Sequence, residues 1–255
     1  MAKVIAPFQI EGTLDDLNFY IDQEGTNRVR MKAETSMTTH KFKTLLSYHK
    51  VRMHSKEFGQ CATIAKTFRV LAVQFNKNAK DGSFAGRVNK LLFEILQEDT
   101  LNELGSRLFK EGIKTRFGQE LLLGFESNKL QPLTQVLKNK KWEIKKNIFD
   151  FPNCVPDTDI DWPEEATHVS FNLAVANWNT EDNSFSTNYG TPIIFSKTDA
   201  PQNVTLECLP PIEQHLHITF LFIGFSKQRG SHHLPLHRKY NTSSIINYAF
   251  HELNP

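Results

Sequence analysis

Two histidines of a predicted strand are the most direct candidates for metal ligands. His215 and His217 are two residues apart, so their side chains point to the same face of a strand and could share a cation. A His-rich segment follows at residues 232–237, but its spacing fixes no third ligand. We therefore interpret His215 and His217 as surface or partly buried histidines and predict no metal site.

An acidic segment imitates the start of a calcium loop. Asp157, Asp159 and Asp161 alternate as the first oxygen ligands of such a loop do. The pattern then fails, because the sixth position is Trp162, where a calcium loop has Gly, and the twelfth is His168, where it has Glu. We interpret the segment as a polar turn between domains, and an irregular surface calcium site stays the alternative.

The sequence contains none of the common catalytic motifs. It has no G-x-S-x-G, no H-E-x-x-H, no Walker-type Gly-Lys-Ser/Thr loop and no G-x-G-x-x-G. The three cysteines, Cys61, Cys154 and Cys208, are odd in number and far apart, which supports neither a disulfide framework nor a zinc module. Cys61 lies on an apolar helical stripe, where a buried, inert thiol is expected. We predict a protein that is not an enzyme, that needs no cofactor and that resides in a reducing compartment.

A basic stripe on a predicted helix is the main candidate for a binding surface. It consists of Lys66, Arg69, Lys77 and Lys80, which fall within about 80° of one another on a helical wheel. Arg87 and Lys90 extend it, although Lys90 can pair with Glu94 four residues later. The stripe could contact nucleic-acid phosphates or an acidic protein face, and a solvated helix face is the simplest interpretation.

Charge divides the chain into two parts of opposite sign. Residues 1–150 carry 25 Lys and Arg against 17 Asp and Glu, whereas residues 151–255 carry 5 against 11. Head-to-tail association between copies would satisfy both charges. With 39% apolar and 11% aromatic residues, the chain has the composition of an ordinary globular protein. It has no membrane span and no cleavable Sec signal, so we expect a cytoplasmic location, with release by another route left open.

The hydrophobic pattern of residues 8–33 predicts a β-hairpin. Leu17, Phe19 and Ile21 alternate with polar residues, and Val29 and Met31 alternate on the return strand. A two-stranded hairpin is marginal alone and cannot bury this apolar side within itself. We therefore predict that Leu17, Phe19 and Ile21 form an interaction surface, toward another copy of the protein, toward the chain's own helices or toward its C-terminal domain.

Helical periodicity follows the hairpin. In residues 56–80 an apolar stripe recurs at spacings of three and four, made of Phe58, Cys61, Ala65, Phe68, Ala72 and Phe75. Ser83 is a candidate N-cap for a next helix, whose inward residues would be Phe84, Val88, Leu91, Leu92 and Ile95. Shorter helices are expected around 101–111 and 116–124. The Lys-rich segment 128–141 is the predicted junction between domains.

Strand patterns fill the second part of the chain. In the clearest strand, Val169, Phe171, Leu173 and Val175 are predicted to face inward and His168, Ser170, Asn172 and Ala174 outward. Further strand-like runs lie at 142–148, 191–196, 204–209, 215–225, 234–238 and 244–250. About seven short strands in roughly 115 residues are typical of a β-sandwich of the immunoglobulin or fibronectin type III kind.

These patterns predict an α+β protein of three parts. They are an N-terminal hairpin at 1–33, a basic helical domain built as a small bundle at 34–130, and an acidic antiparallel β-sandwich at 140–255.

Several segments resemble a family of uncharacterised proteins found widely in Bacteroidota, especially in Flavobacteria-type genomes. They are PFQIEGTLDDLNFY at 7–20, SKEFGQCA at 55–62, DTLNELG at 99–105, GFE at 124–126, ATH at 166–168, FIGF at 222–225, LPL at 234–236 and YN at 240–241. The resemblance covers nearly the whole chain. It implies an N-terminal hairpin and helical region followed by a β-sandwich, and it implies no activity.

The function predicted from these features is that of a non-enzymatic structural or interaction protein, one that assembles with itself or docks on a larger complex. A sandwich with exposed edge strands fits this prediction, because such edges accept another strand. A nucleic-acid-associated protein that uses the basic helices is the first alternative. A carbohydrate- or calcium-binding β-sandwich module is the second.

Overall fold

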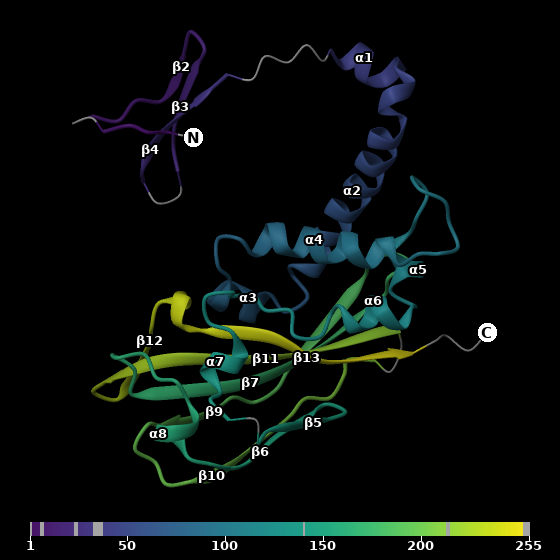
Figure 1. Cartoon of the computed structure of the whole chain (residues 1–255). Helices are drawn as coiled ribbons and strands as arrows, with labels where there is room; N and C mark the ends of the chain where they lie inside the picture. The colour runs from purple at the N-terminus through teal and green to yellow at the C-terminus, as the bar shows by residue number, and fades with distance from the viewer. Residues whose placement is uncertain are drawn as a thin grey trace. The chain divides into compact units, whose positions relative to one another are not determined.

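The structure, a computed structural model, forms two compact units, Met1–His49 and Lys50–Pro255 (Figure 1). It describes residues 2–5, 8–22, 25–32, 38–139, 141–212 and 215–251. Parts of the predicted hairpin turn, of the predicted helical domain and of the predicted junction at 128–141 lie outside these residues. The two units are described separately below.

The first unit contains a small antiparallel sheet. Its strands are β1 (Ala2–Lys3), β2 (Gly12–Leu14), β3 (Leu17–Ile21) and β4 (Asn27–Met31), in the order β1-β4-β3-β2. Two residues connect β2 to β3, and Asp15 adopts a positive φ of 47° there, a conformation that Asp tolerates in tight turns. The strands β3 and β4 confirm the predicted hairpin, and β2 extends it. The helix α1 (Thr39–Thr44) and the 3-10 helix η1 (Leu46–Tyr48) follow.

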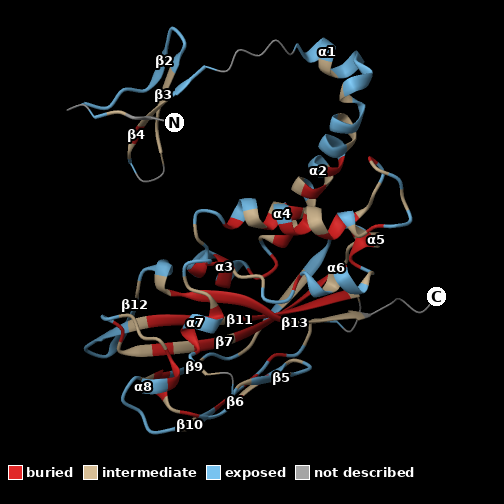
Figure 2. Cartoon of the chain, in the orientation of Figure 1, coloured by how far each residue is buried: buried red, intermediate tan, exposed pale blue. Residues whose placement is uncertain are grey.

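The second unit begins with helices that pack on a sheet (Figures 1 and 2). The helices are α2 (His49–Phe68), α3 (Val73–Ala79), α4 (Phe84–Gln97), α5 (Phe109–Gly112), α6 (Arg116–Glu120), α7 (Leu133–Val136) and α8 (Pro156–Asp159). The helix α4 is confirmed as predicted, with its five inward residues buried.

Two antiparallel sheets make up the rest of the second unit. The strands are β5 (Glu143–Lys145), β6 (Ile148–Cys154), β7 (His168–Trp178), β8 (Phe185–Tyr189), β9 (Ile193–Ser196), β10 (Gln202–Glu207), β11 (His215–Arg229), β12 (His232–Pro235) and β13 (Thr242–His251), with the 3-10 helix η2 (Arg238–Tyr240) before β13. The larger sheet has the order β12-β11-β7-β8, with β13 also on β11 and β9 also on β7. The smaller sheet has the order β10-β6-β5. The predicted mixture of helices with antiparallel sheets is confirmed, whereas β8 and most of β6 were not predicted.

The larger sheet is buried on both faces, which creates two hydrophobic cores. One face packs on the helices, and the other packs on the smaller sheet. Strand β7 serves both, because Phe171 and Leu173 point into the second core while Ala174 and Trp178 point into the first. The predicted inward residues of this strand are confirmed. The prediction that Ala174 faces outward is wrong, because the helical layer covers that face.

The helices and the larger sheet therefore share one core. Phe68 of α2 packs edge-on against Trp178 of β7, with ring centroids 5.9 Å apart. The sequence pattern suggested separate helical and β domains divided at 128–141, whereas the compact units of the structure divide at His49.

Candidate functional site

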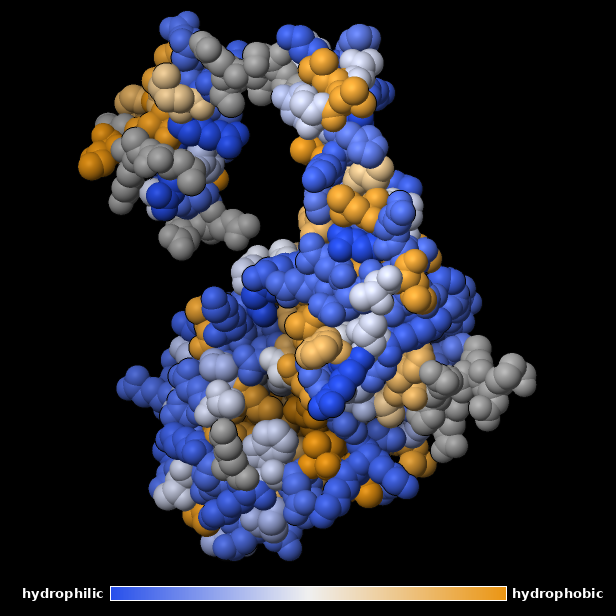
Figure 3. Space-filling view, turned by 45° about the vertical axis from the view of Figure 1, so that its right-hand side comes forward, coloured by the Kyte–Doolittle hydropathy of each residue, from blue (hydrophilic) through white to orange (hydrophobic). Residues whose placement is uncertain are grey.

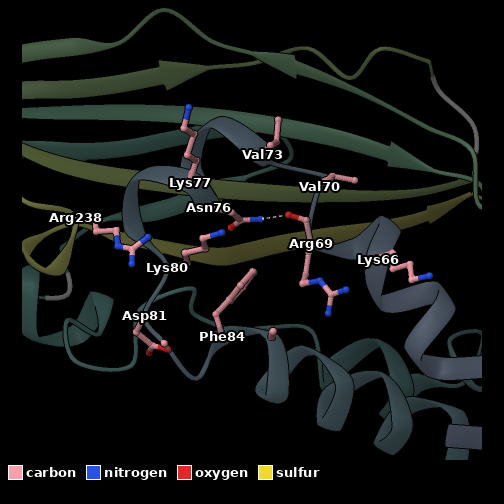
Figure 4. Close-up of a pocket in the computed structure, with 12 residues that line it drawn as sticks. Lys66, Arg69, Val70, Val73, Asn76, Lys77, Lys80, Asp81, Phe84 and Arg238 are labelled. Carbon is pink, nitrogen blue, oxygen red and sulfur yellow. Dashed lines mark hydrogen bonds between the residues drawn. The ribbon is translucent and has the colours of Figure 1, made fainter. Parts of the chain in front are cut away.

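The four predicted basic residues line one groove in the second unit, although not as the face of a single helix. Lys66 lies in the last turn of α2, Arg69 lies between α2 and α3, Lys77 belongs to α3, and Lys80 follows α3. Arg238 of η2, which the sequence did not single out, joins them. The groove has a volume of about 900 Å³ (Figure 4).

The groove exists because the predicted helix 56–80 is broken after Phe68. Strand β8 forms hydrogen bonds with the segment around the break. The Thr187 hydroxyl donates to the carbonyl of Leu71, and the Tyr189 hydroxyl accepts from Gln74 N at 3.3 Å. Phe75 then packs between the rings of Tyr189 and Phe222, at centroid distances of 5.2 and 5.1 Å. The prediction of one continuous helix is wrong, because these contacts with the sheet replace helical hydrogen bonds.

Asn76 fixes the conformation of the break. Its side chain is buried, its Nδ2 donates to the carbonyl of Arg69 at 3.0 Å, and its Oδ1 accepts from Ser127 Oγ at 2.6 Å. The Arg69 backbone is thereby held in place while its side chain stays half-buried at the groove.

The predicted burial of Phe58 is wrong, since it lies half-exposed on α2 and packs against Phe93 at 6.1 Å.

Asp81, the one acidic residue among the described residues that line the groove, is already engaged. Asp81 accepts hydrogen bonds from Ser83 N at 2.7 Å, from Lys129 N at 2.7 Å and from Arg87 Nη2 at 2.9 Å. Burial alone would raise the pKa of Asp81, but these hydrogen bonds and the charge of Arg87 outweigh it and hold the pKa below its usual range. Asp81 therefore organises the turn before α4 and is not available to neutralise the groove.

A buried amide places Arg238 beside the helices. Asn241 accepts from Phe225 N at 3.0 Å and donates to the carbonyl of Asn78 at 2.8 Å, which ties the end of η2 to α3. Asn128 donates to the carbonyls of Lys239 and Asn241 and holds the same turn from the other side. The segment that carries Arg238 is thus connected to α3 by hydrogen bonds.

The cations of the groove have no acidic partner among the described residues. No described carboxylate lies within 4.0 Å of the charged groups of Lys66, Arg69, Lys77, Lys80 or Arg238. Positive charge therefore accumulates there without compensation from the parts of the chain that the structure describes.

Arg87 and Lys90 do not extend this surface. Arg87 donates to the carbonyls of Glu126 and Ser127, pairs with Asp81 and lies 5.5 Å from the centre of the Phe125 ring. Lys90 pairs with Glu94 at 3.6 Å, as the spacing predicted. Both cations therefore stabilise the helical layer.

The predicted apolar surface of the hairpin lies on one face of the N-terminal sheet. Residues paired directly across antiparallel strands share a face, and Leu17 pairs with both Leu14 and Met31 while Phe19 pairs with Val29. Leu14 is 65% exposed and Met31 71% exposed. Phe19 and Ile21, on the same face of β3, are half-buried. Figure 3 shows hydrophobic side chains gathered on this sheet, at the upper left.

Four of the candidate metal ligands, His217 and the three aspartates, have other partners. His217 is buried, and its Nε2 forms a hydrogen bond of 2.6 Å with the carbonyl of Ile212. Asp157 pairs with Lys197 at 3.5 Å and Asp161 with Lys138 at 3.1 Å. The Asp159 carboxylate accepts from Asn139 and from Val155 N. Among the described residues, no group of three His, Cys, Asp or Glu side chains could hold a metal ion.

The three cysteines are buried thiols. Burial raises the pKa of Cys61 and of Cys154 to about 12 and also raises the pKa of Cys208. At neutral pH such thiols are protonated and poorly nucleophilic. The predicted burial of Cys61 is confirmed.

A buried ion pair joins α2 to the segment between α4 and α5. Glu57 of segment 55–62 accepts from Gly105 N at 2.7 Å and binds Arg107 through Nε at 2.9 Å and Nη2 at 2.7 Å. The Arg107 hydrogen bond lowers the pKa of Glu57, despite burial. Gly105 has a φ of +89°, and a Cβ there would lie 2.2 Å from Met53 Sδ. Sequence reasoning missed this pair, although Glu57 lies four residues before Cys61 on the buried stripe.

Comparison with known proteins gives no match: no family model, no curated protein and no solved structure is similar to this chain. Among the helices that the structure describes, none combines the length and the apolar character needed to cross a membrane.

Proposed function

We propose that the protein is a non-enzymatic interaction protein that associates with further copies of itself through the N-terminal sheet. The observation that carries this proposal is the apolar face formed by Leu14, Leu17, Phe19, Val29 and Met31, in which Leu14, Leu17 and Met31 are exposed and Phe19 and Val29 are half-buried. The strands of this unit form a single layer, and a sheet needs a second layer to bury an apolar face.

A second copy of the same sheet is the partner that fits this face. The face carries no charged side chain among its described residues, whereas the opposite face carries Arg28 and Arg30. Two copies can therefore stack apolar face to apolar face and leave their basic faces in water. Burying a Leu, Met or Phe side chain contributes roughly 1.5–3 kcal/mol.

The size of the face predicts weak pairwise association. The strands β3 and β4, of five residues each, and β2, of three residues, present roughly 210 Å² at about 3.4 Å per residue and a strand spacing of about 4.8 Å. A stable interface buries about 800 Å² on each partner. One pair of sheets should therefore bind reversibly, and a durable assembly requires several copies or a larger complex.

The titratable groups of the described residues support a binding role over catalysis. The cysteines are protonated at neutral pH, and the buried Glu57 and Asp81 are engaged in hydrogen bonds that hold loops.

A cytoplasmic location belongs to the same proposal, supported by three free thiols. The immunoglobulin-type assignment also remains a proposal: two packed antiparallel sheets support it, and the helical layer on one of them is an addition to that architecture.

Sedimentation velocity over a range of protein concentrations tests the proposed association. We expect the parent chain to show reversible, concentration-dependent oligomers, and the double variant Leu17→Gln/Phe19→Gln to remain monomeric. The matched control Thr13→Gln/Asn18→Gln changes the opposite face of the same strands and should associate as the parent does. A parent that stays monomeric throughout, or a control that dissociates equally, would contradict the proposal.

A further inference from the structure

The basic groove carries a second inference, independent of the N-terminal sheet. It lies wholly in the second unit and contains five cations, with one carboxylate that is engaged elsewhere. Uncompensated positive charge in a recess attracts an anionic ligand, because low-dielectric walls focus the field.

The donors and acceptors of the groove indicate which anion fits. Lys and Arg side chains only donate hydrogen bonds. The two side chains of the groove that could accept, Asn76 and Asp81, are occupied by Ser127 and by the turn before α4. The groove therefore offers donors and no free side-chain acceptor among its described residues.

This imbalance favours a phosphate backbone over an acidic peptide. A phosphodiester backbone presents acceptor oxygens and no donors, so every polar atom of it can be satisfied by Lys and Arg. A peptide brings one backbone N–H for each non-proline residue, and each N–H needs an acceptor that the groove does not supply.

The acidic half of a second copy also fits poorly. Four of its eleven carboxylates already pair with lysines of the same chain: Asp157, Asp161, Glu165 and Glu181. Part of the charge of that half is thus compensated within the molecule, whereas the five cations of the groove have no carboxylate partner among the described residues.

The arrangement of the side chains indicates one strand of backbone. Figure 4 shows Arg69 and Lys80 extending into the space between α3 and the start of α4, with the Phe84 ring between them, and Arg238 at one end. The amine of Lys77 points away from these three. The helix α4, 14 residues long, begins at the groove, and the partial positive charge of its N-terminus adds to the attraction.

The apolar wall of the groove is limited. Val70 is 39% exposed and Val73 49% exposed, whereas Phe84 is 4% exposed and offers little surface for stacking. Binding should therefore be electrostatic and independent of base sequence, in contrast to proteins that stack bases on exposed aromatic rings. A duplex carries its phosphates on a convex surface, so a flexible single strand enters a recess between helices more readily.

We infer that this groove binds the phosphate backbone of single-stranded nucleic acid without sequence preference. Lys66, Arg69, Lys80 and Arg238 supply the contacts. Since each phosphate contact on a single strand contributes about 0.7 to the dependence of log K on log salt, four contacts predict a slope of about −2.8.

Fluorescence anisotropy with the full chain and a labelled oligothymidylate, measured over a series of KCl concentrations, tests this inference. The triple variant Arg69→Gln/Lys80→Gln/Arg238→Gln should lower affinity roughly 100- to 500-fold at 50 mM salt and reduce the slope by about 2. The control Lys145→Gln/Lys197→Gln/Lys227→Gln makes the same change in net charge and should alter affinity less than threefold. If the triple variant does not fold, Lys80→Gln alone should reduce the slope by about 0.7.

Three results would overturn the inference. They are no binding by the parent at low salt, an equal loss in the control variant, and tighter binding of a duplex or of a poly-glutamate peptide of equal length. Because the groove variants leave the N-terminal sheet unchanged, their failure is distinguishable from a failure of the proposed self-association.

Discussion

The buried pair of Glu57 and Arg107 provides the sharpest test of how the helical layer is held together. The Glu57 side chain is fully buried and accepts three hydrogen bonds, one from Gly105 N and two from Arg107. The substitution Glu57→Gln keeps the volume but removes the charge, so Arg107 loses its counter-ion and an amide group faces its donors. Breaking a buried ion pair by changing one partner destabilises by about 3–5 kcal/mol.

Urea unfolding followed by tryptophan fluorescence measures this loss. The three tryptophans, Trp142, Trp162 and Trp178, all belong to the second unit, so the signal reports on that unit alone. For a unit of this size, 1 kcal/mol shifts the melting temperature by about 2–4 °C, so a parallel thermal scan should show a decrease of roughly 6–20 °C. The control Glu120→Gln breaks an exposed pair with Arg116 and should leave the free energy of unfolding nearly unchanged, because solvent screens that pair.

The pH dependence supplies an independent check. The pKa of Glu57 is lower in the folded chain than its ordinary value of 4.5, so the unfolded state binds the proton more readily. This stabilisation is fully present above pH 4.5 and is lost as the pH falls through the folded pKa. The parent should therefore lose stability on acidification more steeply than Glu57→Gln. Two results would refute the role assigned to Glu57. One is an equal loss in the free energy of unfolding for Glu57→Gln and Glu120→Gln, and the other is an equal decrease of stability with falling pH for the parent and for Glu57→Gln.

Three further outcomes are expected. Gly105→Ala should lower the free energy of unfolding by about 1–3 kcal/mol, because it forces a side chain into a positive φ. In the same urea titration, Gly86→Ala should raise the free energy of unfolding by about 0.5–1 kcal/mol, because a Cβ at this position of α4 meets open space. Cys61 and Cys154 should react with a thiol reagent only after denaturation, and fast labelling of the native chain at neutral pH would contradict their burial and raised pKa. Phe171→Ala should destabilise by about 3–5 kcal/mol, since the ring is fully buried between the two sheets, and a loss below about 1 kcal/mol would contradict that packing.

Local periodicity determined those parts of the structure whose environment is set by near neighbours in the chain. The alternation in Leu17, Phe19 and Ile21 predicted a strand and its apolar face, and the stripe from Phe84 to Ile95 predicted α4. In each case a hydrophobic period of two or of 3.6 residues is enough to predict the element, because the period shows which side of that element is apolar.

Contacts between segments distant in the sequence determined the rest. A helical stripe continues from Phe68 to Phe75, but hydrogen bonds from β8, more than a hundred residues later, break the helix between them. Ala174 was predicted to face outward, because a small residue is compatible with either side of a strand. The helical layer that packs on this face of the sheet buries Ala174 in the first core.

The candidate surfaces show the same division. The sequence alone identified Lys66, Arg69, Lys77 and Lys80 as a basic group, because they would share one side of a continuous helix, although in the structure they meet across the break between α2 and α3. It could not identify Arg238, because the Asn241 hydrogen bond to Asn78 that places it in the groove spans 163 residues. The sequence also could not distinguish Arg87 from the cations of the groove. Arg87 pairs with Asp81 and donates to two carbonyls, whereas the cations of the groove have no described carboxylate partner. Charge is a property of the sequence, whereas its neutralisation depends on which groups the fold brings within a few ångströms.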